Sequence, residues 1–175
     1  MKKNLILAGY NYARLRRLAT QFAEIFDMRF FDIYDYFIFD NSPNSIADLY
    51  HKNGWDYVDE QVKDIVEMQT SFENVVSVLD LKIASICTEF FDKIKENNVV
   101  VYVEHNDKTE DIRKRHFFYR SQEEMAYFLL TEDALENIMK KVKDELADII
   151  IEDGELAYDQ LRDKILEEFQ KMATE

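Results

Sequence analysis

The chain has 175 residues, of which 47% are hydrophobic, and a formal net charge of −14, so we predict one folded domain over residues 1–175 rather than a disordered segment. The negative charge argues against nucleic acid or an anionic membrane as a partner, because the field of the protein repels both. No run of about 18 apolar residues is available to span a bilayer, and the single cysteine excludes an internal disulfide, so we expect a cytoplasmic protein.

Strand and helix patterns alternate along the chain. Residues 5–8 are a continuous apolar run, typical of a buried parallel strand, and a helix with an apolar stripe at Leu15, Leu18, Phe22 and Phe26 follows. The later predicted elements are a strand at 28–33, a turn at 41–45, helices at 45–53 and 55–69, a strand at 74–79, a helix at 84–97, a strand at 99–103, a charged helical piece at 108–115, a helical region at 125–142, a strand at 147–151 and a helix at 161–172. This alternation predicts an α/β fold with three α/β/α layers around a five-stranded parallel sheet.

The connection after the first strand has the frame of a phosphate-binding loop, G-x-x-x-x-G-K-[ST], without its chemical groups. Gly9 stands at the first glycine, but Arg14, Leu15 and Arg16 occupy the positions of the second glycine, the lysine and the hydroxyl. The lysine neutralises phosphate charge and the hydroxyl binds Mg²⁺ during phosphoryl transfer. The sequence therefore argues against that mechanism, as does the presence of only 3 glycines, since phosphate-binding loops need them.

Six segments resemble the shikimate kinase family in order and spacing. They are residues 4–9, 23–32, 45–55, 73–76, 98–103 and 145–151. Within them, Ser45-Ile-Ala-Asp-Leu-Tyr is similar to the family's S-I-A-E-I-F, and Glu145-Leu-Ala-Asp is similar to its E-x-A-D ending. The resemblance covers nearly the whole chain and implies a shikimate kinase-like P-loop NTPase fold, with a small lid at about residues 108–124.

The positions that the resemblance would make functional carry other residues here. Asp32 matches the first acid of the family's Asp-x-Asp, but the second acid, which contacts substrate, is Tyr34. Two further substrate-binding positions of the family fall at Trp55-Asp56 and at residues 81–83, and an arginine of the family falls at Met139. Together with the altered loop, these departures imply a catalytically inactive, pseudokinase-like homologue with no catalytic residue.

Two basic groups are candidates for one anion-binding site. Arg14, Arg16 and Arg17 lie at the predicted N-terminus of the first helix, where free N–H groups and the helix dipole favour anions. The second group falls where the family has its lid and consists of Arg113, Lys114, Arg115, His116 and Arg120. One hypothesis is a remodelled site for a phosphorylated ligand or an acidic peptide. The interpretation that we favour is that these arginines only pair with the many acidic residues.

The sequence predicts neither a metal site nor a cofactor. Asp32 is a candidate metal ligand, although a lone carboxylate at a strand end is more often a helix cap or a solvated residue. His51, His105 and His116 lack the spacing of zinc ligands, and Cys87 lies on an apolar helix face, which indicates a buried thiol.

We therefore expect a binding or regulatory module that acts on a protein partner, or on a phosphorylated small ligand at the remodelled site. Residues 121–175 hold 16 acidic and 6 basic side chains, which suggests either a solvated surface or a docking face for a basic protein. The alternative is a small-molecule kinase that uses Mg-ATP at an unorthodox nucleotide site. Saturable binding of Mg-ATP separates the two hypotheses.

Overall fold

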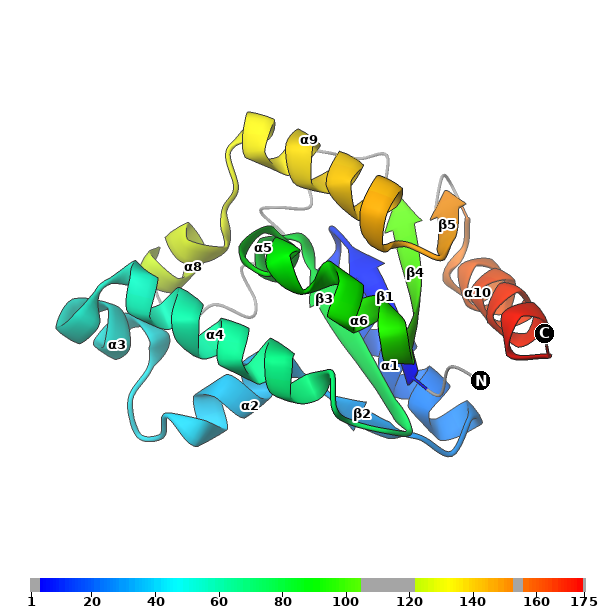
Figure 1. The fold of residues 1–175 in the computed structure, drawn as a ribbon, viewed down its shortest axis with the longest axis horizontal. Helices are drawn as coiled ribbons and strands as arrows, with labels where there is room; N and C mark the ends of the chain where they lie inside the picture. The colour runs from blue at the N-terminus through cyan, green and yellow to red at the C-terminus, as the bar shows by residue number, and fades with distance from the viewer. Residues whose placement is uncertain (1–3, 105–121, 153–155, 175) are drawn as a thin grey trace.

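A five-stranded parallel sheet runs through the molecule in the order β2-β3-β1-β4-β5 (Figure 1). The computed structural model describes residues 4–104, 122–152 and 156–174. The strands are β1 (Asn4–Gly9), β2 (Arg29–Phe31), β3 (Val75–Asp80), β4 (Asn98–Glu104) and β5 (Ile149–Glu152). Every adjacent pair is parallel, so the predicted sheet is confirmed.

Helices cover both faces of the sheet, which confirms the three-layer architecture (Figure 1). On one face, α1 (Tyr12–Ile25) and α10 (Tyr158–Thr174) pack against the sheet. The helices of the other face are α2 (Ile33–Asp40), α3 (Ile46–Asn53), α4 (Trp55–Gln69), α5 (Leu81–Ile86), the short 3-10 turn η1 (Thr88–Phe90), α6 (Phe91–Asn97), α8 (Gln122–Phe128), α9 (Glu132–Lys141) and the π-helix η3 (Val142–Leu146). Strands β1 and β3 are buried along their whole length, because both of their faces lie under helices.

Helix starts follow the capping chemistry that the sequence predicts. Ser45 and Asp48 form a reciprocal capping box at α3, in which the Ser45 hydroxyl accepts from the Asp48 N–H at 3.1 Å and the Asp48 carboxylate accepts from the Ser45 N–H at 2.8 Å. The predicted helix at 55–69 is also confirmed, as α4.

Three predicted elements have different boundaries in the structure. The strand expected at 28–33 ends at Phe31, and Ile33 opens α2, which the sequence analysis missed. Because α2 is apolar on nearly every side, it lacks the polar stripe that identifies a surface helix. The helix expected at 84–97 is interrupted at Cys87, and the region at 125–142 is broken between α8 and α9.

The predicted lid at 108–124 lies outside the described residues except for its last three, which open α8. The charged helical piece at 108–115 and the basic group from Arg113 to Arg120 also lie outside them. Among the helices that the structure describes, none combines the length and the apolar content needed to cross a bilayer.

The packing of α1 gives a matched test of the core. Phe22 is 0% exposed, whereas Ile25 on the same helix is 52% exposed. We expect Phe22→Ala to lower the free energy of unfolding by about 3–5 kcal/mol, and Ile25→Ala by less than about 1 kcal/mol. Urea denaturation followed by circular dichroism measures both. Equal losses in the two variants would contradict the placement of α1.

Candidate functional site

The carboxyl ends of the parallel strands meet at one edge of the sheet, where open α/β sheets bind their ligands. Gly9 ends β1, Asp80 ends β3, and Asp32 directly follows β2. The residues that the sequence analysis singled out lie at or near this edge, so it is the candidate site.

The connection from β1 to α1 is only Tyr10 and Asn11, because α1 already begins at Tyr12. Three backbone N–H groups at the start of α1 are hydrogen-bonded to this connection. The N–H of Tyr12 donates to the Tyr10 carbonyl at 3.2 Å, and that of Leu15 donates to the Asn11 carbonyl at 3.0 Å. The N–H of Arg14 donates to Asn11 Oδ1 at 3.1 Å, which caps the helix. A phosphate-binding loop instead directs such donors at its ligand.

Gly9 has a structural reason of its own to be glycine. A Cβ at this position would lie 2.7 Å from the Val103 carbonyl oxygen and 3.3 Å from Leu15 Cδ1. The end of β1 therefore approaches β4 and α1 too closely for any side chain.

Leu15, at the position of the loop lysine, points into the core. Its side chain is 2% exposed and packs in the cluster that α1 forms with the sheet. A residue in this orientation does not reach the space outside the strand ends.

The three arginines of α1 turn in two directions. Arg14 Nη2 donates to the Leu156 carbonyl at 3.1 Å, and the Arg17 guanidinium lies 4.3 Å from the centre of the Tyr158 ring. Arg16 instead pairs with the start of α2, with its Nη2 2.5 Å from Asp35 Oδ2 and its Nε 3.7 Å from Asp32 Oδ2.

Asp32 is 6% exposed and is the N-cap of α2, accepting from the Asp35 N–H at 2.9 Å. This confirms the cap interpretation of its carboxylate. The Tyr12 hydroxyl also donates to Asp32 Oδ2. With Arg16 beside it, the carboxylate has a donor or a cation on several sides.

Asp80 is a second buried acid at this edge, and the sequence analysis did not single it out. It is 3% exposed, caps α5 by accepting from the Ile83 N–H at 2.8 Å, and lies 3.4 Å from the Tyr34 hydroxyl. An aspartate between an apolar strand and a helix was the available signal. Within residues 4–104, 122–152 and 156–174, no group of three or more potential metal ligands occurs.

Aromatic side chains from α1, α2, α3, α4 and α8 contact one another in a chain of rings. We call this the aromatic cluster; its members are Tyr12, Tyr34, Tyr50, Trp55, Tyr127 and Phe128. Trp55 lies between Tyr50 and Tyr127, at ring-centre distances of 3.9 and 4.8 Å. Tyr34 meets Phe128 edge to face at 4.5 Å. Tyr127 and Phe128 on α8 were missed as site residues because their spacing indicates only a core helix.

The other family positions also join this packing. Lys82 Nζ lies 4.6 Å from the centre of the Tyr127 ring, and Tyr127 donates its hydroxyl proton to Asp59 Oδ1 at 2.7 Å. Met139 on α9 packs, partly buried, against the core. Tyr34, Trp55 and Lys82, which sequence alignment placed at substrate-binding positions, therefore contact protein side chains.

Burial raises the pKa of several acidic groups near the site. Burial is the main cause for both Tyr12 and Tyr127, and the neighbouring carboxylates of Asp32 and Asp59 raise the tyrosine pKa values further. Burial also raises the pKa of Cys87 to about 12. This thiol is 0% exposed, which confirms the prediction that Cys87 is buried.

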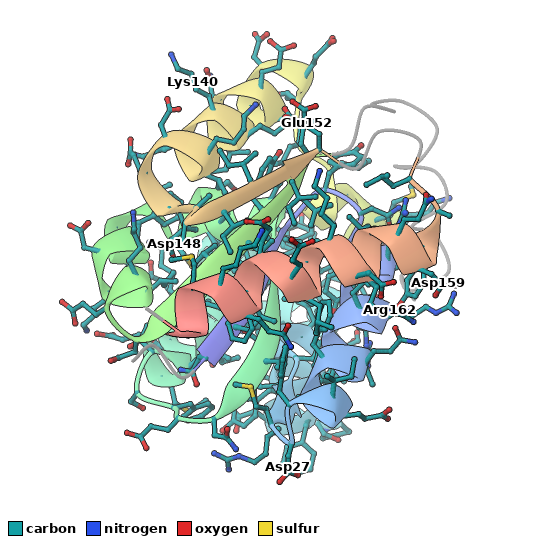
Figure 2. The ribbon with its side chains drawn as sticks, turned by 90° about the vertical axis from the view of Figure 1, so that its right-hand side faces the viewer. Asp27, Lys140, Asp148, Glu152, Asp159 and Arg162 are labelled. Atoms are coloured by element: carbon teal, nitrogen blue, oxygen red, sulfur yellow. The ribbon has the colours of Figure 1, made fainter. Side chains whose placement is uncertain are left out.

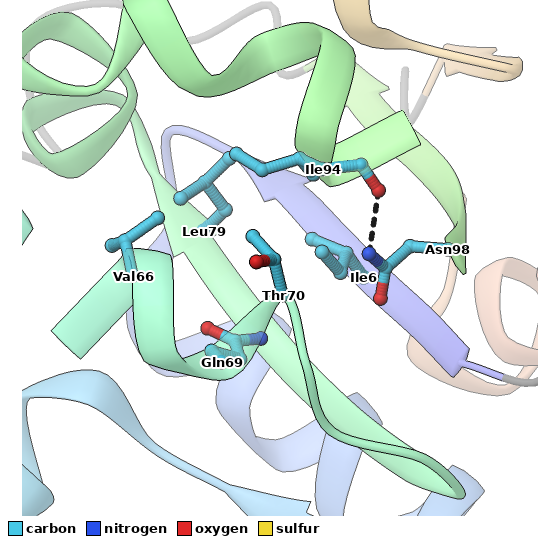
Figure 3. A pocket seen from close by; sticks show the side chains of 7 residues that line it. All are labelled: Ile6, Val66, Gln69, Thr70, Leu79, Ile94 and Asn98. Atoms are coloured by element: carbon cyan, nitrogen blue, oxygen red, sulfur yellow. Dashed lines mark hydrogen bonds between the residues drawn. The ribbon is translucent and has the colours of Figure 1, made fainter. Parts of the chain in front are cut away.

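A small cavity lies near the opposite edge of the sheet (Figure 3). Its volume is about 10 Å³, which is enough for about one water molecule. The lining residues are Ile6, Val66, Gln69, Thr70, Leu79, Ile94 and Asn98. Asn98 at the start of β4 donates its amide to the Ile94 carbonyl at 2.5 Å. The cavity is too small for a substrate.

Leu15→Lys tests whether the lysine position is core. We expect this variant to lose at least about 3 kcal/mol of stability, because it removes buried apolar contacts and buries an ammonium group. Thr20→Lys adds the same charge on the exposed side of α1 and should change stability by less than about 1 kcal/mol. Urea denaturation measures both. A Leu15→Lys protein as stable as Thr20→Lys would contradict the buried orientation.

The buried tyrosines predict a loss of stability at alkaline pH. Their folded-state pKa values lie above 10.0, the ordinary pKa of tyrosine, so the stabilising effect is complete below about pH 10 and is lost as the pH rises above it. Urea denaturation at about pH 8 and pH 11 measures this loss. Tyr127→Phe should show a smaller loss than the parent, whereas Tyr57→Phe, at a side chain that is 39% exposed, should match the parent. Equal losses in all three would contradict the prediction.

Solved structures with a similar fold include small-molecule kinases. The shikimate kinase from Acinetobacter baumannii, solved with shikimate, is 20% identical, with a TM-score of 0.66 over 97% of this chain and 93% of that one. The shikimate kinase from Aquifex aeolicus vf5 is 17% identical, with a TM-score of 0.69 over 97% and 98%. A gluconokinase from Sinorhizobium meliloti 1021 is 11% identical, with a TM-score of 0.56 over 99% and 94%.

No protein-family model matches the sequence, and neither does any curated protein. At these identities the structural neighbours establish the fold alone. The chain has the P-loop NTPase fold in its shikimate kinase-like form.

Proposed function

We propose that this protein is a non-catalytic relative of the small kinases that works by binding a protein partner. The observation that carries the proposal is the β1–α1 connection. Because α1 begins at Tyr12, the N–H groups of Tyr12, Arg14 and Leu15 are hydrogen-bonded within the turn. These donors are the groups with which a P-loop holds the phosphates of its nucleotide.

The side chains around the loop support the same proposal. Leu15 is buried in the core and Arg16 is paired with Asp32 and Asp35. Neither supplies the ammonium group or the Mg²⁺-binding hydroxyl on which phosphoryl transfer depends. Since positioning and charge stabilisation provide most of the catalysis in this reaction, the loss of both groups removes its main contributions.

The aromatic cluster also supports the proposal. Tyr34 and Trp55 pack against Phe128 and Tyr127 of α8, in the region where the resemblance to shikimate kinases puts the substrate. Opening this region exposes large aromatic surfaces to water, which is costly.

The net charge of the molecule indicates which class of protein partner it attracts. A net charge of −14 favours proteins with basic surfaces by long-range attraction. The remodelled anion site at Arg14, Arg16, Arg17, Arg113, Arg115 and Arg120 stays a second proposal for a phosphorylated small ligand. The side chains of Arg14 and Arg17 turn toward Leu156 and Tyr158, whereas that of Arg16 turns toward Asp35. Because the three guanidinium groups do not converge, the anion-site proposal has less support than the protein-binding one.

Thermal unfolding with millimolar Mg-ATP, Mg-ADP and shikimate tests the proposal. A ligand at 100 times its dissociation constant stabilises the folded state by about 2.7 kcal/mol, which raises the melting temperature by a few degrees. We expect no rise with any of the three, because the N–H groups of Tyr12, Arg14 and Leu15 are already hydrogen-bonded and because Tyr34 and Trp55 contact rings of α8. A genuine shikimate kinase run in parallel is the positive control.

A saturable, Mg²⁺-dependent shift with nucleotide would contradict the proposal and favour the kinase alternative. The triple variant Arg14→Gly, Leu15→Lys, Arg16→Ser adds a second test, since it restores the loop sequence. We expect it to remain without nucleotide binding and to be less stable than the parent, because helix α1 and the core, rather than three residues, close the loop.

A further inference from the structure

The outer edge of β5 (Ile149–Glu152) is open among the described residues. This strand pairs with β4 alone and ends the sheet. Figure 2 shows it crossing the front of the molecule between α9 and α10, with Asp148 near its start and Glu152 near its tip. An open strand edge offers a row of backbone donors and acceptors to another chain.

The sequence of β5 lacks two common protections of an edge strand, namely proline and lysine. It consists of three isoleucines followed by Glu152. Ile149 and Ile151 pack on the core side that faces α10, whereas Ile150 is 49% exposed.

The backbone direction at Ile150 follows from the register. The backbone N–H and C=O of Val100 on β4 point toward β5. The N–H donates to Asp148 Oδ2 and the carbonyl accepts from the Asp148 N–H, both at 2.9 Å. Tyr102, two residues further along β4, therefore also faces β5. Tyr102 is paired with Ile150, and in a parallel ladder the residue opposite such a partner turns its own N–H and C=O outward.

Acidic residues flank β5 along the chain. Residues 144–152 contain four acidic residues and no basic one. An acid stands at each end of the strand, Asp148 before it and Glu152 at its tip (Figure 2). A strand that pairs here meets a negative charge on either side of an exposed isoleucine.

We propose that β5 binds an extended basic segment of a partner protein by strand addition. The segment carries β-branched residues at its centre and a lysine or arginine at each end, so that its charges meet Asp148 and Glu152. A second copy of this chain fits poorly, because antiparallel self-pairing at Ile150 sets Asp148 opposite Glu152, and like charges facing each other are destabilising. This inference rests on the proposed binding function and names its partner class.

A peptide titration tests the inference. The probe is the pentapeptide Lys-Thr-Val-Thr-Lys with blocked ends, whose lysines lie four residues apart on one face, as Asp148 and Glu152 do. The matched controls are Glu-Thr-Val-Thr-Glu and Lys-Thr-Pro-Thr-Lys. Calorimetry at low salt should detect binding of the first peptide at least about tenfold tighter than that of either control. Equal binding of the proline peptide would mean attraction by charge alone and would overturn strand addition.

Variants of the protein locate the site. Ile150→Lys and Glu152→Lys should each weaken binding at least about tenfold. Ile25→Lys adds the same charge at a side chain that is 52% exposed on α1 and should weaken it less than about threefold. If Ile150→Lys does not fold, Glu152→Lys decides alone. Unchanged binding in the β5 variants, or a dimer of the parent that they abolish, would overturn the proposal.

Mg-ATP titrated into the same samples separates the two proposals. Nucleotide binding with a normal peptide result overturns only the proposed lack of catalysis. Failure of the peptide to bind, with no nucleotide effect, overturns only the strand-addition site.

Discussion

The buried carboxylate of Asp32 is the group around which the candidate site is organised. A buried carboxylate is costly unless donors and cations surround it. Here the donors are the N–H of Asp35 and the hydroxyl of Tyr12, and the cation is Arg16. Satisfying this one group fixes the start of α2 and ties the first turn of α1 to the end of β2. The space next to a P-loop is thereby occupied by the protein's own polar groups.

The same principle explains why the sequence predicts the architecture better than the site. Continuous apolar runs such as that of β1, and the capping box at Ser45, are local signals, and both keep their predicted structure. The role of Leu15 is not local. Aligned by motif, it occupies the lysine position, but the start of α1 at Tyr12 turns its side chain into the core.

The aromatic cluster shows a similar limit. The spacing of Tyr127 and Phe128 indicates a helix with a buried face, which is correct for α8. That this face packs against Trp55 and Tyr34 depends on contacts between segments far apart in the chain. A single sequence does not specify such pairs, so a site composed of them is visible only in three dimensions.

The central position of β1 has a consequence for how the chain folds. Leu5, near the N-terminus, pairs with Val76 on one side and with Val99 on the other. During synthesis this apolar strand leaves the ribosome long before either neighbour exists. Contacts so distant in sequence are formed slowly, since the closure of long loops must precede them. The nascent protein therefore exposes an aggregation-prone strand that is unpaired until β3 is made and that keeps one open edge until β4 is complete.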